Sequence, residues 1–108
     1  MPASIQNLFQ NIPDHLHDEL VEIITESDGI RIERIVSKGH SSPDAFWYDQ
    51  DKNELVILLK GKATLRIEGE IETRLMGPGD YLDIKAHVRH QVAWTEPLIE
   101  TVWLAVHY

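Results

Sequence analysis

The chain has 108 residues, a formal net charge of −8 from 10 basic and 18 acidic residues, and no cysteine. This length suffices for one domain with one hydrophobic core. The acidic balance argues against nucleic acid or an anionic membrane surface as a partner, because both require a basic face. The lack of cysteine excludes disulfides, thiolate nucleophiles and zinc–sulfur sites. No apolar run approaches the roughly 20 residues of a membrane span and no signal pattern opens the chain, so we expect a cytoplasmic protein.

The first 20 residues mix polar residues with spaced apolar ones. Pro13 followed by Asp14 is typical of a helix start, so we expect a short helical segment over residues 13–20. We divide the chain into an N-terminal helical or extended segment, residues 1–29, and a barrel, residues 30–108, on which that segment packs. His15 and His17 are two residues apart and cannot share a helix face, so we expect them on the solvated surface.

From Leu20 onward, short alternating segments predict one strand after another. The expected strands cover residues 21–25, 30–37, 54–60, 62–68, 71–76, 81–84, 91–95 and 99–107. Glycines and prolines separate them, most clearly in the turn at residues 77–80. Many short strands with close turn signals predict an all-β sandwich or barrel rather than alternating strands and helices. Residues 38–51 form the one long irregular segment.

The alternation of apolar and polar residues within the strands predicts which strand faces are exposed to solvent. Residues 62–68 alternate apolar and polar side chains, whereas residues 54–60 and 101–108 are largely apolar on both faces. In residues 30–37, isoleucines and a valine alternate with Arg31 and Glu33. A strand buried on both faces needs a second layer outside it, which the N-terminal segment or a second subunit could supply. We favour a homodimer.

A carboxylate and a histidine on separate strands form the leading candidate site. Glu54 opens its strand on the parity of Val56, and His90 enters a later strand on the parity of Val92. In a closed barrel, inward residues near the same rim converge even when they are far apart in sequence. We therefore expect Glu54 and His90 to face one cavity, as a divalent-metal or small-molecule site.

The order of strands, the spacing of Glu54 and Gly61, the turn containing Gly79 and the later His90 resemble a small single-domain cupin. The segment Trp-Tyr-Asp-Gln at residues 47–50 resembles a "WYDQ" subgroup of small bacterial cupins of unassigned function. The resemblance covers roughly residues 30 to 108. It implies an all-β fold, the double-stranded β-helix or RmlC-like cupin jelly roll.

The motif match is partial. The two histidine positions of the family's first motif fall on Trp47 and Asp49, and the proline, glycine and asparagine of its second motif fall on Lys85, His87 and Trp94. The usual three histidines and one glutamate are therefore absent. Their remaining counterparts are Asp49, Glu54 and His90. Two carboxylates and one histidine suit iron, manganese, nickel or zinc. We expect no organic cofactor.

The candidate residues fall into two groups, and several have a purely structural alternative. Glu54 could pair with an arginine across the sheet, and His90 could bond to a backbone carbonyl. His87 lies three residues before His90, so on a regular strand the two side chains would point to opposite faces. His87 joins the site only if the turn at residues 85–86 redirects its side chain. His107 shares strand parity with Trp103 and could be a ligand or a hydrogen-bond donor. The expected metal site comprises Glu54, His90, Asp49 and His87, and the expected pocket lining comprises Trp47, Tyr48, Trp94, Trp103 and His107.

Two classes of function remain open. One is a metal-dependent cupin enzyme of the oxygenase, isomerase or lyase type that acts on a small molecule. The other is a non-catalytic barrel that binds a small ligand without metal. The sequence contains no nucleophile-elbow serine and no phosphate-binding glycine loop.

Overall fold

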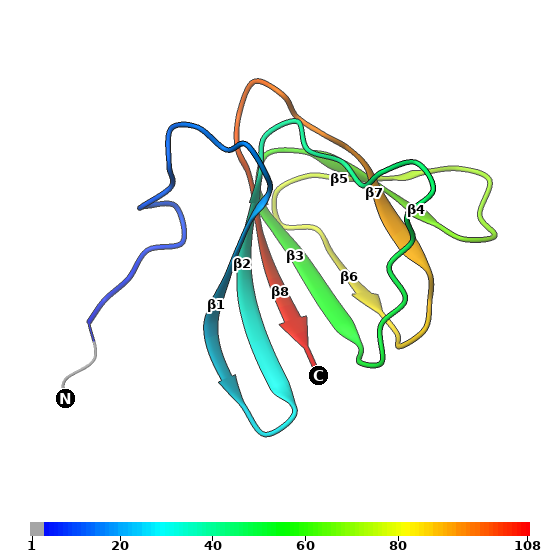
Figure 1. The fold of residues 1–108 in the computed structure, drawn as a ribbon, viewed down its shortest axis with the longest axis horizontal. Helices are drawn as coiled ribbons and strands as arrows, with labels where there is room; N and C mark the ends of the chain where they lie inside the picture. Colours follow the sequence, from blue (N-terminus) through cyan, green and yellow to red (C-terminus); the bar gives the residue numbers. More distant parts are fainter. Residues whose placement is uncertain (1–3) are drawn as a thin grey trace.

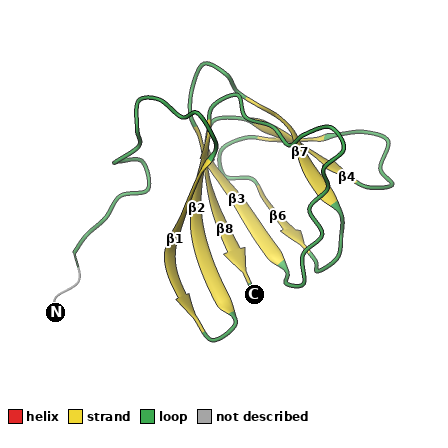
Figure 2. Ribbon diagram, in the orientation of Figure 1, coloured by secondary structure: helices red, strands yellow, loops and turns green. Residues whose placement is uncertain are grey.

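A computed structural model describes residues 4–108 of the chain (Figure 1). These residues form strands, turns and loops, with no helix among them (Figure 2). The eight strands are β1 (Leu20–Ser27), β2 (Ile30–Ser37), β3 (Glu54–Lys60), β4 (Ala63–Ile67), β5 (Arg74–Met76), β6 (Tyr81–Ile84), β7 (His90–Thr95) and β8 (Thr101–His107).

The strands make two antiparallel sheets. The larger sheet has the order β1-β2-β8-β3-β6, and the smaller one has the order β5-β4-β7. Figure 1 shows the smaller sheet beside the β3 and β6 side of the larger one, with residues 38–53 as a long loop that runs alongside β7. The predicted all-β jelly roll is confirmed by this arrangement.

The core lies between the inner faces of the two sheets. Leu58 and Ala63 are fully buried there, and Trp103 is 4% exposed. Alternation places these side chains inward, because every second residue of a strand points to the same face. The full core cluster is Val56, Leu58, Ala63, Leu65, Met76, Ile84, Trp103 and Ala105.

Gly61 allows the chain to pass from the larger sheet into the smaller one. Its φ is +91°, in the left-handed region that side chains rarely adopt. A Cβ at this position would lie 2.4 Å from Thr101 Oγ1 and 2.7 Å from Thr101 Cα. Both the backbone angle and the close approach of β8 therefore require glycine at this turn.

The predicted helical segment over residues 13–20 is wrong. Residues 4–19 are extended chain and turns, and β1 begins at Leu20. The carbonyls of this region are bonded by side chains of the barrel rather than by helical N–H groups. Arg34 donates to the carbonyls of Leu8 (3.2 Å) and Gln10 (2.6 Å), and the His40 ring lies 3.1 Å from the carbonyl of Leu16. A short helix is marginal alone, so these long-range contacts decide its conformation.

No helix that could cross a membrane occurs within residues 4–108.

Candidate functional site

A row of four side chains crosses the inner face of the larger sheet. Arg31 on β2 pairs with His107 on β8, His107 pairs with Glu54 on β3, and Glu54 pairs with Ile84 on β6. Directly paired residues on neighbouring strands point to the same face, so the row brings three ionisable groups together. It lies at the end of the sheet where β8 finishes and β3 begins.

This row lines a cavity of about 200 Å³ between the sheets. The volume is below the roughly 300–1,000 Å³ of pockets for drug-sized ligands, so it suits a small metabolite. The lining combines apolar side chains with ionisable ones, of which Glu54, His90 and His107 are buried. The lining residues are Glu19, Val21, Arg31, Glu33, Ile35, Tyr48, Gln50, Glu54, Val56, Leu65, Ile84, His90, Val92, Trp103 and His107.

Glu54 and His90 form the central pair of the cavity wall. His90 Nε2 lies 3.3 Å from Glu54 Oε1, and the two side chains are only 5% and 10% exposed. On its other side, His90 Nδ1–H donates to the carbonyl oxygen of Val88 at 2.9 Å. A carbonyl only accepts, so Nδ1 carries a proton and Nε2 is the nitrogen that faces Glu54.

The surroundings of His90 favour its charged form. Burial acts to lower the pKa of His90, but the contact with the Glu54 carboxylate and the bond to the Val88 carbonyl outweigh it, and the pKa is raised. His90 as an imidazolium satisfies both acceptors, the Glu54 side chain and the Val88 carbonyl. The pair therefore holds a proton between a carboxylate and an imidazole inside a cavity.

A second carboxylate–imidazole pair lies next to the first. His107 Nε2–H donates to Glu33 Oε1 at 2.8 Å, and the same nitrogen lies 3.8 Å from Glu54 Oε2. Arg31 Nε approaches Glu33 Oε2 to 3.1 Å. That Nε is nevertheless a buried donor with no hydrogen-bond acceptor, because its N–H is not aligned with the carboxylate. A chain of alternating basic and acidic side chains thus runs from Arg31 to His90.

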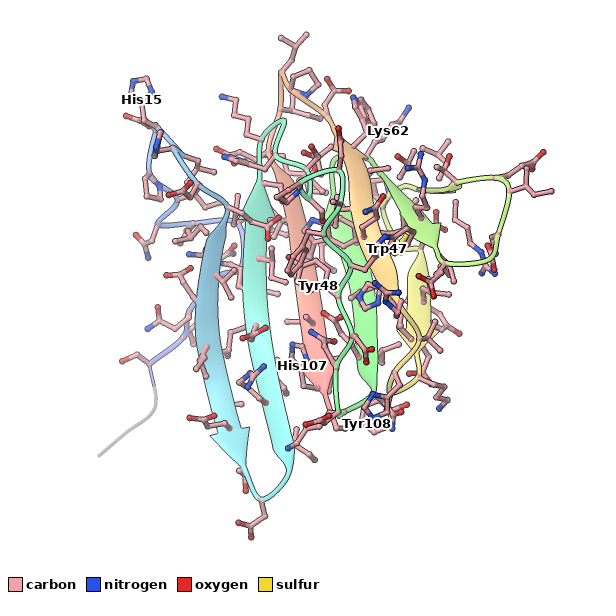
Figure 3. All side chains as sticks on the ribbon, turned by 45° about the vertical axis from the view of Figure 1, so that its right-hand side comes forward. His15, Trp47, Tyr48, Lys62, His107 and Tyr108 are labelled. Carbon is pink, nitrogen blue, oxygen red and sulfur yellow. The ribbon has the colours of Figure 1, made fainter. Side chains whose placement is uncertain are left out.

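Tyr48 closes the cavity from the long loop. Its ring stacks on the His90 imidazole with centroids 5.4 Å apart, and its backbone exchanges hydrogen bonds with that of His90. Burial, followed by the nearby charges of Glu19 and Glu54, raises the pKa of the Tyr48 phenol, which therefore keeps its proton. Figure 3 labels Tyr48 and His107, which come from the loop and from β8.

The structure places Asp49 and His87 outside the cavity, which corrects their predicted place in the site. Asp49 Oδ1 and His87 Nδ1 lie 2.9 Å apart on the surface, with both side chains about half exposed. His87 has a φ of +66°, and its backbone N–H donates to the carbonyl of Gln50. The turn therefore re-aims His87 toward the loop and not toward His90.

The aromatic residues of the predicted pocket also divide into those that line the cavity and those that lie outside it. Trp103 and Tyr48 line the cavity, but Trp47 and Trp94 do not. A bulge in β7 causes the miss at Trp94: Val92 pairs with Leu65, whereas Trp94 pairs with the outward-facing Thr64. Trp94 is consequently 40% exposed. Trp47 instead lies under the guanidinium of Arg89, at 5.8 Å.

Sequence reasoning missed Arg31 and Glu33 as site residues. The isoleucines that alternate with them predicted that the opposite face of β2 is the interior. The structure shows the reverse at this end of the strand, where Ile30 is 46% exposed and Glu33 is buried. One signal could have found them, since Ile35 shares their parity and lines the cavity with them. An arginine and a glutamate two residues apart on one strand also satisfy each other's charge when turned inward.

The four candidate metal ligands contact one another in succession and do not converge on a common point. Contacts of 2.8, 3.8 and 3.3 Å lead from Glu33 through His107 and Glu54 to His90. Across the described part of the chain, no group of three histidine or acidic side chains could hold a metal ion. His90 and Glu54 could supply two ligand positions, which is fewer than the three that a protein usually gives a catalytic ion. These residues as placed do not fit a metal centre.

Solved structures with similar folds span bacteria and archaea. A crystal structure from Ralstonia eutropha JMP134, of a protein provisionally named mannose-6-phosphate isomerase, is 45% identical, covers 97% of each chain and has a TM-score of 0.93. A protein from Thermus thermophilus is 16% identical over 95% of this chain and 94% of its own, with a TM-score of 0.76. An RmlC-like cupin with a double-stranded β-helix from Methanocaldococcus jannaschii is 16% identical over 99% and 91%, with a TM-score of 0.70.

No curated protein matches the chain. The Cupin domain family matches residues 33–107, which begin within β2 and end with β8. This range contains most of the residues that line the cavity, among them Glu54, His90 and His107. The chain belongs to the cupin family.

Proposed function

We propose that the cavity binds a small polar molecule and moves a proton on it, with Glu54 and His90 as the acid–base pair. The observation that carries this proposal is the 3.3 Å approach of His90 Nε2 to Glu54 Oε1 on a cavity wall. The Val88 carbonyl fixes the imidazole so that Nε2 faces the carboxylate. A carboxylate and an imidazolium held side by side can take a proton from one atom and give one to its neighbour.

Aldose–ketose isomerisation is the reaction class that this pair suits. The Glu54 carboxylate accepts the proton from C2 of an open-chain aldose, and the C–H electron pair forms a C1–C2 double bond. His90 gives its Nε2 proton to the carbonyl oxygen on C1. Returning a proton from Glu54 to C1, and the O2 proton to His90, yields the ketose and restores both groups. The reaction consumes no oxidant or co-reactant.

The similarity to the Ralstonia eutropha protein supports this class. Its provisional name is mannose-6-phosphate isomerase, and it is 45% identical over 97% of both chains. We therefore propose mannose 6-phosphate as the first substrate to test. The cavity volume of about 200 Å³ is compatible with a molecule of metabolite size rather than a larger ligand.

The test is proton exchange in D₂O. Mannose 6-phosphate is incubated with the protein, and the C2–H signal is followed by NMR. The wild type should replace this hydrogen with deuterium and form fructose 6-phosphate. Glu54→Gln removes the base and should slow exchange at least about a hundredfold, in the range of general-base contributions. His15→Gln is the matched control, because His15 lies on the exposed N-terminal segment away from the cavity (Figure 3).

Two outcomes would replace the proposal with an alternative. Saturable binding without exchange in the wild type would make the protein a non-catalytic small-ligand barrel. One divalent ion per chain, measured by mass spectrometry and lost in Glu54→Gln, would favour a metal-dependent cupin enzyme.

We further propose that the protein is a homodimer whose second copy covers β1. Val21 lines the cavity and is 51% exposed, and Ile23 and Ile24 beside it are 56% and 49% exposed. These side chains form an apolar strip on the edge strand of the larger sheet. A second copy on this strip would bury it and narrow the cavity where it opens toward solvent. Sedimentation as a monomer at micromolar concentration would contradict the dimer.

A further inference from the structure

Arg31 lines the cavity, but its buried Nε atom has no hydrogen-bond partner. It follows the β1–β2 turn, lies opposite His107, and lines the cavity with its side chain 42% exposed. The exposed part is the guanidinium end, because the Nε atom is buried. The side chain thus runs from a dry wall to the cavity opening.

The buried Nε–H of Arg31 has no acceptor. Glu33 Oε2 is 3.1 Å away, but the N–H does not point at it, and no side chain or carbonyl of the described residues accepts from Arg31. Leaving a buried donor unpaired costs roughly 1–3 kcal/mol, so native proteins seldom do so without a functional reason. Because the Nε atom is buried, a ligand would meet the terminal nitrogens of the guanidinium, which the 42% exposure of the side chain leaves toward the cavity opening.

Guanidinium chemistry defines which ligand group would fit. Arginine keeps its charge at any physiological pH and presents its donors in a planar fork that matches carboxylate and phosphate oxygens. The neighbouring Glu33 faces only the Nε side of the guanidinium, with Oε2 at 3.1 Å, and its Oε1 accepts a hydrogen bond from His107, so the terminal nitrogens of Arg31 are left for an anion. With a net charge of −8, the protein as a whole repels anions, so an anion would bind here for local reasons.

We propose that Arg31 is an oxyanion subsite, so that the cavity's ligand carries a phosphate or carboxylate group at its end remote from Glu54 and His90. This inference rests on the proposed function and adds the position of the charged group. Arg31 and Glu54 flank His107 in the cross-strand row, two strand spacings or about 10 Å apart along the sheet. The reacting atoms and the anionic group therefore lie at opposite ends of the ligand.

Inorganic phosphate and acetate are the probes for this subsite. NMR of ¹⁵N-labelled protein follows the Nε–H signal of Arg31 during each titration. We expect a saturable shift with at least one of them, and the tighter of the two identifies the group. Arg31→Met should weaken that binding at least about tenfold, and Arg31→Lys should recover part of it. Arg74→Met is the matched control, because Arg74 pairs with Glu70 on the exposed surface.

Comparison with substrate turnover separates this inference from the proposed function. In Arg31→Met, the KM for mannose 6-phosphate should rise at least about tenfold, and by a larger factor than the KM for uncharged mannose. Phosphate binding that depends on Arg31, without any C2 exchange in the wild type, would keep the subsite and remove the acid–base proposal. Exchange on mannose 6-phosphate that Arg31→Met leaves unaffected would overturn the subsite, as would a wild-type Nε–H signal that responds to neither anion.

Discussion

Two arginines three residues apart on β2 show how differently the two faces of the larger sheet are organised. Arg34 points outward, is 8% exposed, and binds Glu22 together with the carbonyls of Leu8, Gln10 and Asn11. Arg31 points inward, has a buried Nε, and has no hydrogen-bond acceptor among the described residues. The outer arginine has its donors occupied by its own chain, and the inner one does not.

The difference separates groups that hold the fold from groups that are free to meet a ligand. On the outer face, a buried charge is surrounded by carbonyls and a carboxylate that compensate its loss of water. On the inner face, Glu33, Glu54, His90 and His107 contact one another in pairs, and Arg31 approaches Glu33 without an aligned hydrogen bond. Four predictions test this contrast, from the largest expected effect to the smallest.

The largest difference should be between Trp103, on the inner face of the larger sheet, and Trp94, on the outer face of the smaller sheet. Trp103→Ala removes a 4% exposed side chain from the core and should lower the free energy of unfolding by about 3–5 kcal/mol. Trp94→Ala removes a side chain that is 40% exposed on the outer face, and should cost less than about 1 kcal/mol. Urea denaturation of both variants measures the difference. Equal losses would mean that the bulge in β7 does not turn Trp94 outward.

The two arginines should differ in the same assay. Arg34→Met leaves Glu22 and three backbone carbonyls without their donor and should cost about 2–4 kcal/mol. Arg31→Met removes a buried donor without an acceptor, which stabilises the fold, but it also removes the 3.1 Å contact with Glu33, which destabilises it. The two effects oppose each other, so stability should change by less than about 1 kcal/mol. Hydrogen exchange adds a local measurement, because Arg34→Met should also release the amides of residues 8–11. A more destabilising Arg31→Met would show that Arg31 is a structural residue.

The inner pairs should make stability depend on pH. The pKa of His90 is raised in the folded protein above its ordinary value of 6.5. The folded state therefore holds more protons between the two values, so stability is fully present below about pH 6.5 and falls as pH rises through the folded pKa. Unfolding measured from about pH 6 to about pH 9 should show this fall. His90→Gln should remove the slope, whereas a slope that persists would assign it to another group.

The smallest effect should come from the surface pair of Asp49 and His87. His87→Gly places glycine where φ is +66° and should raise the free energy of unfolding by up to about 1 kcal/mol. The lost contact with Asp49 is half exposed and worth little. Thermal unfolding gives the stability, and phosphate titration should be unchanged. Weaker phosphate binding in His87→Gly would connect this turn to the cavity.

The fold could be predicted from the sequence because its signals are local. Alternation marks the strands, and Gly61 and Gly79 adopt the positive φ that their turns require. The N-terminal helix could not be excluded in this way. The extended course of residues 13–20 depends on His40, whose ring lies 3.1 Å from the carbonyl of Leu16 and 3.2 Å from that of His17. These carbonyls are 24 and 23 residues earlier in the chain, and no local propensity records such a contact.

The site was only partly predictable for a related reason. Strand parity brought Glu54 and His90 to one cavity, since both lie in strands of regular alternation at their rim. Parity failed at Trp94, where one bulged residue reverses the face, and at Arg31 and Glu33, where charged side chains point inward. Register shifts and compensating charges are set by the partner strand, so a single strand's sequence does not reveal them. The metal-binding role given to Glu54 and His90 stays a prediction.

The anchoring of the N-terminal segment by Arg34 has a consequence for sequence divergence. Arg34 binds carbonyl oxygens of residues 8, 10 and 11, which every amino acid provides. The side chains of these residues could therefore drift during evolution while the segment keeps its course over the sheet. Selection on the position of residues 8–11 would act mainly on Arg34, and residues that look unconstrained in this stretch would still follow the same path.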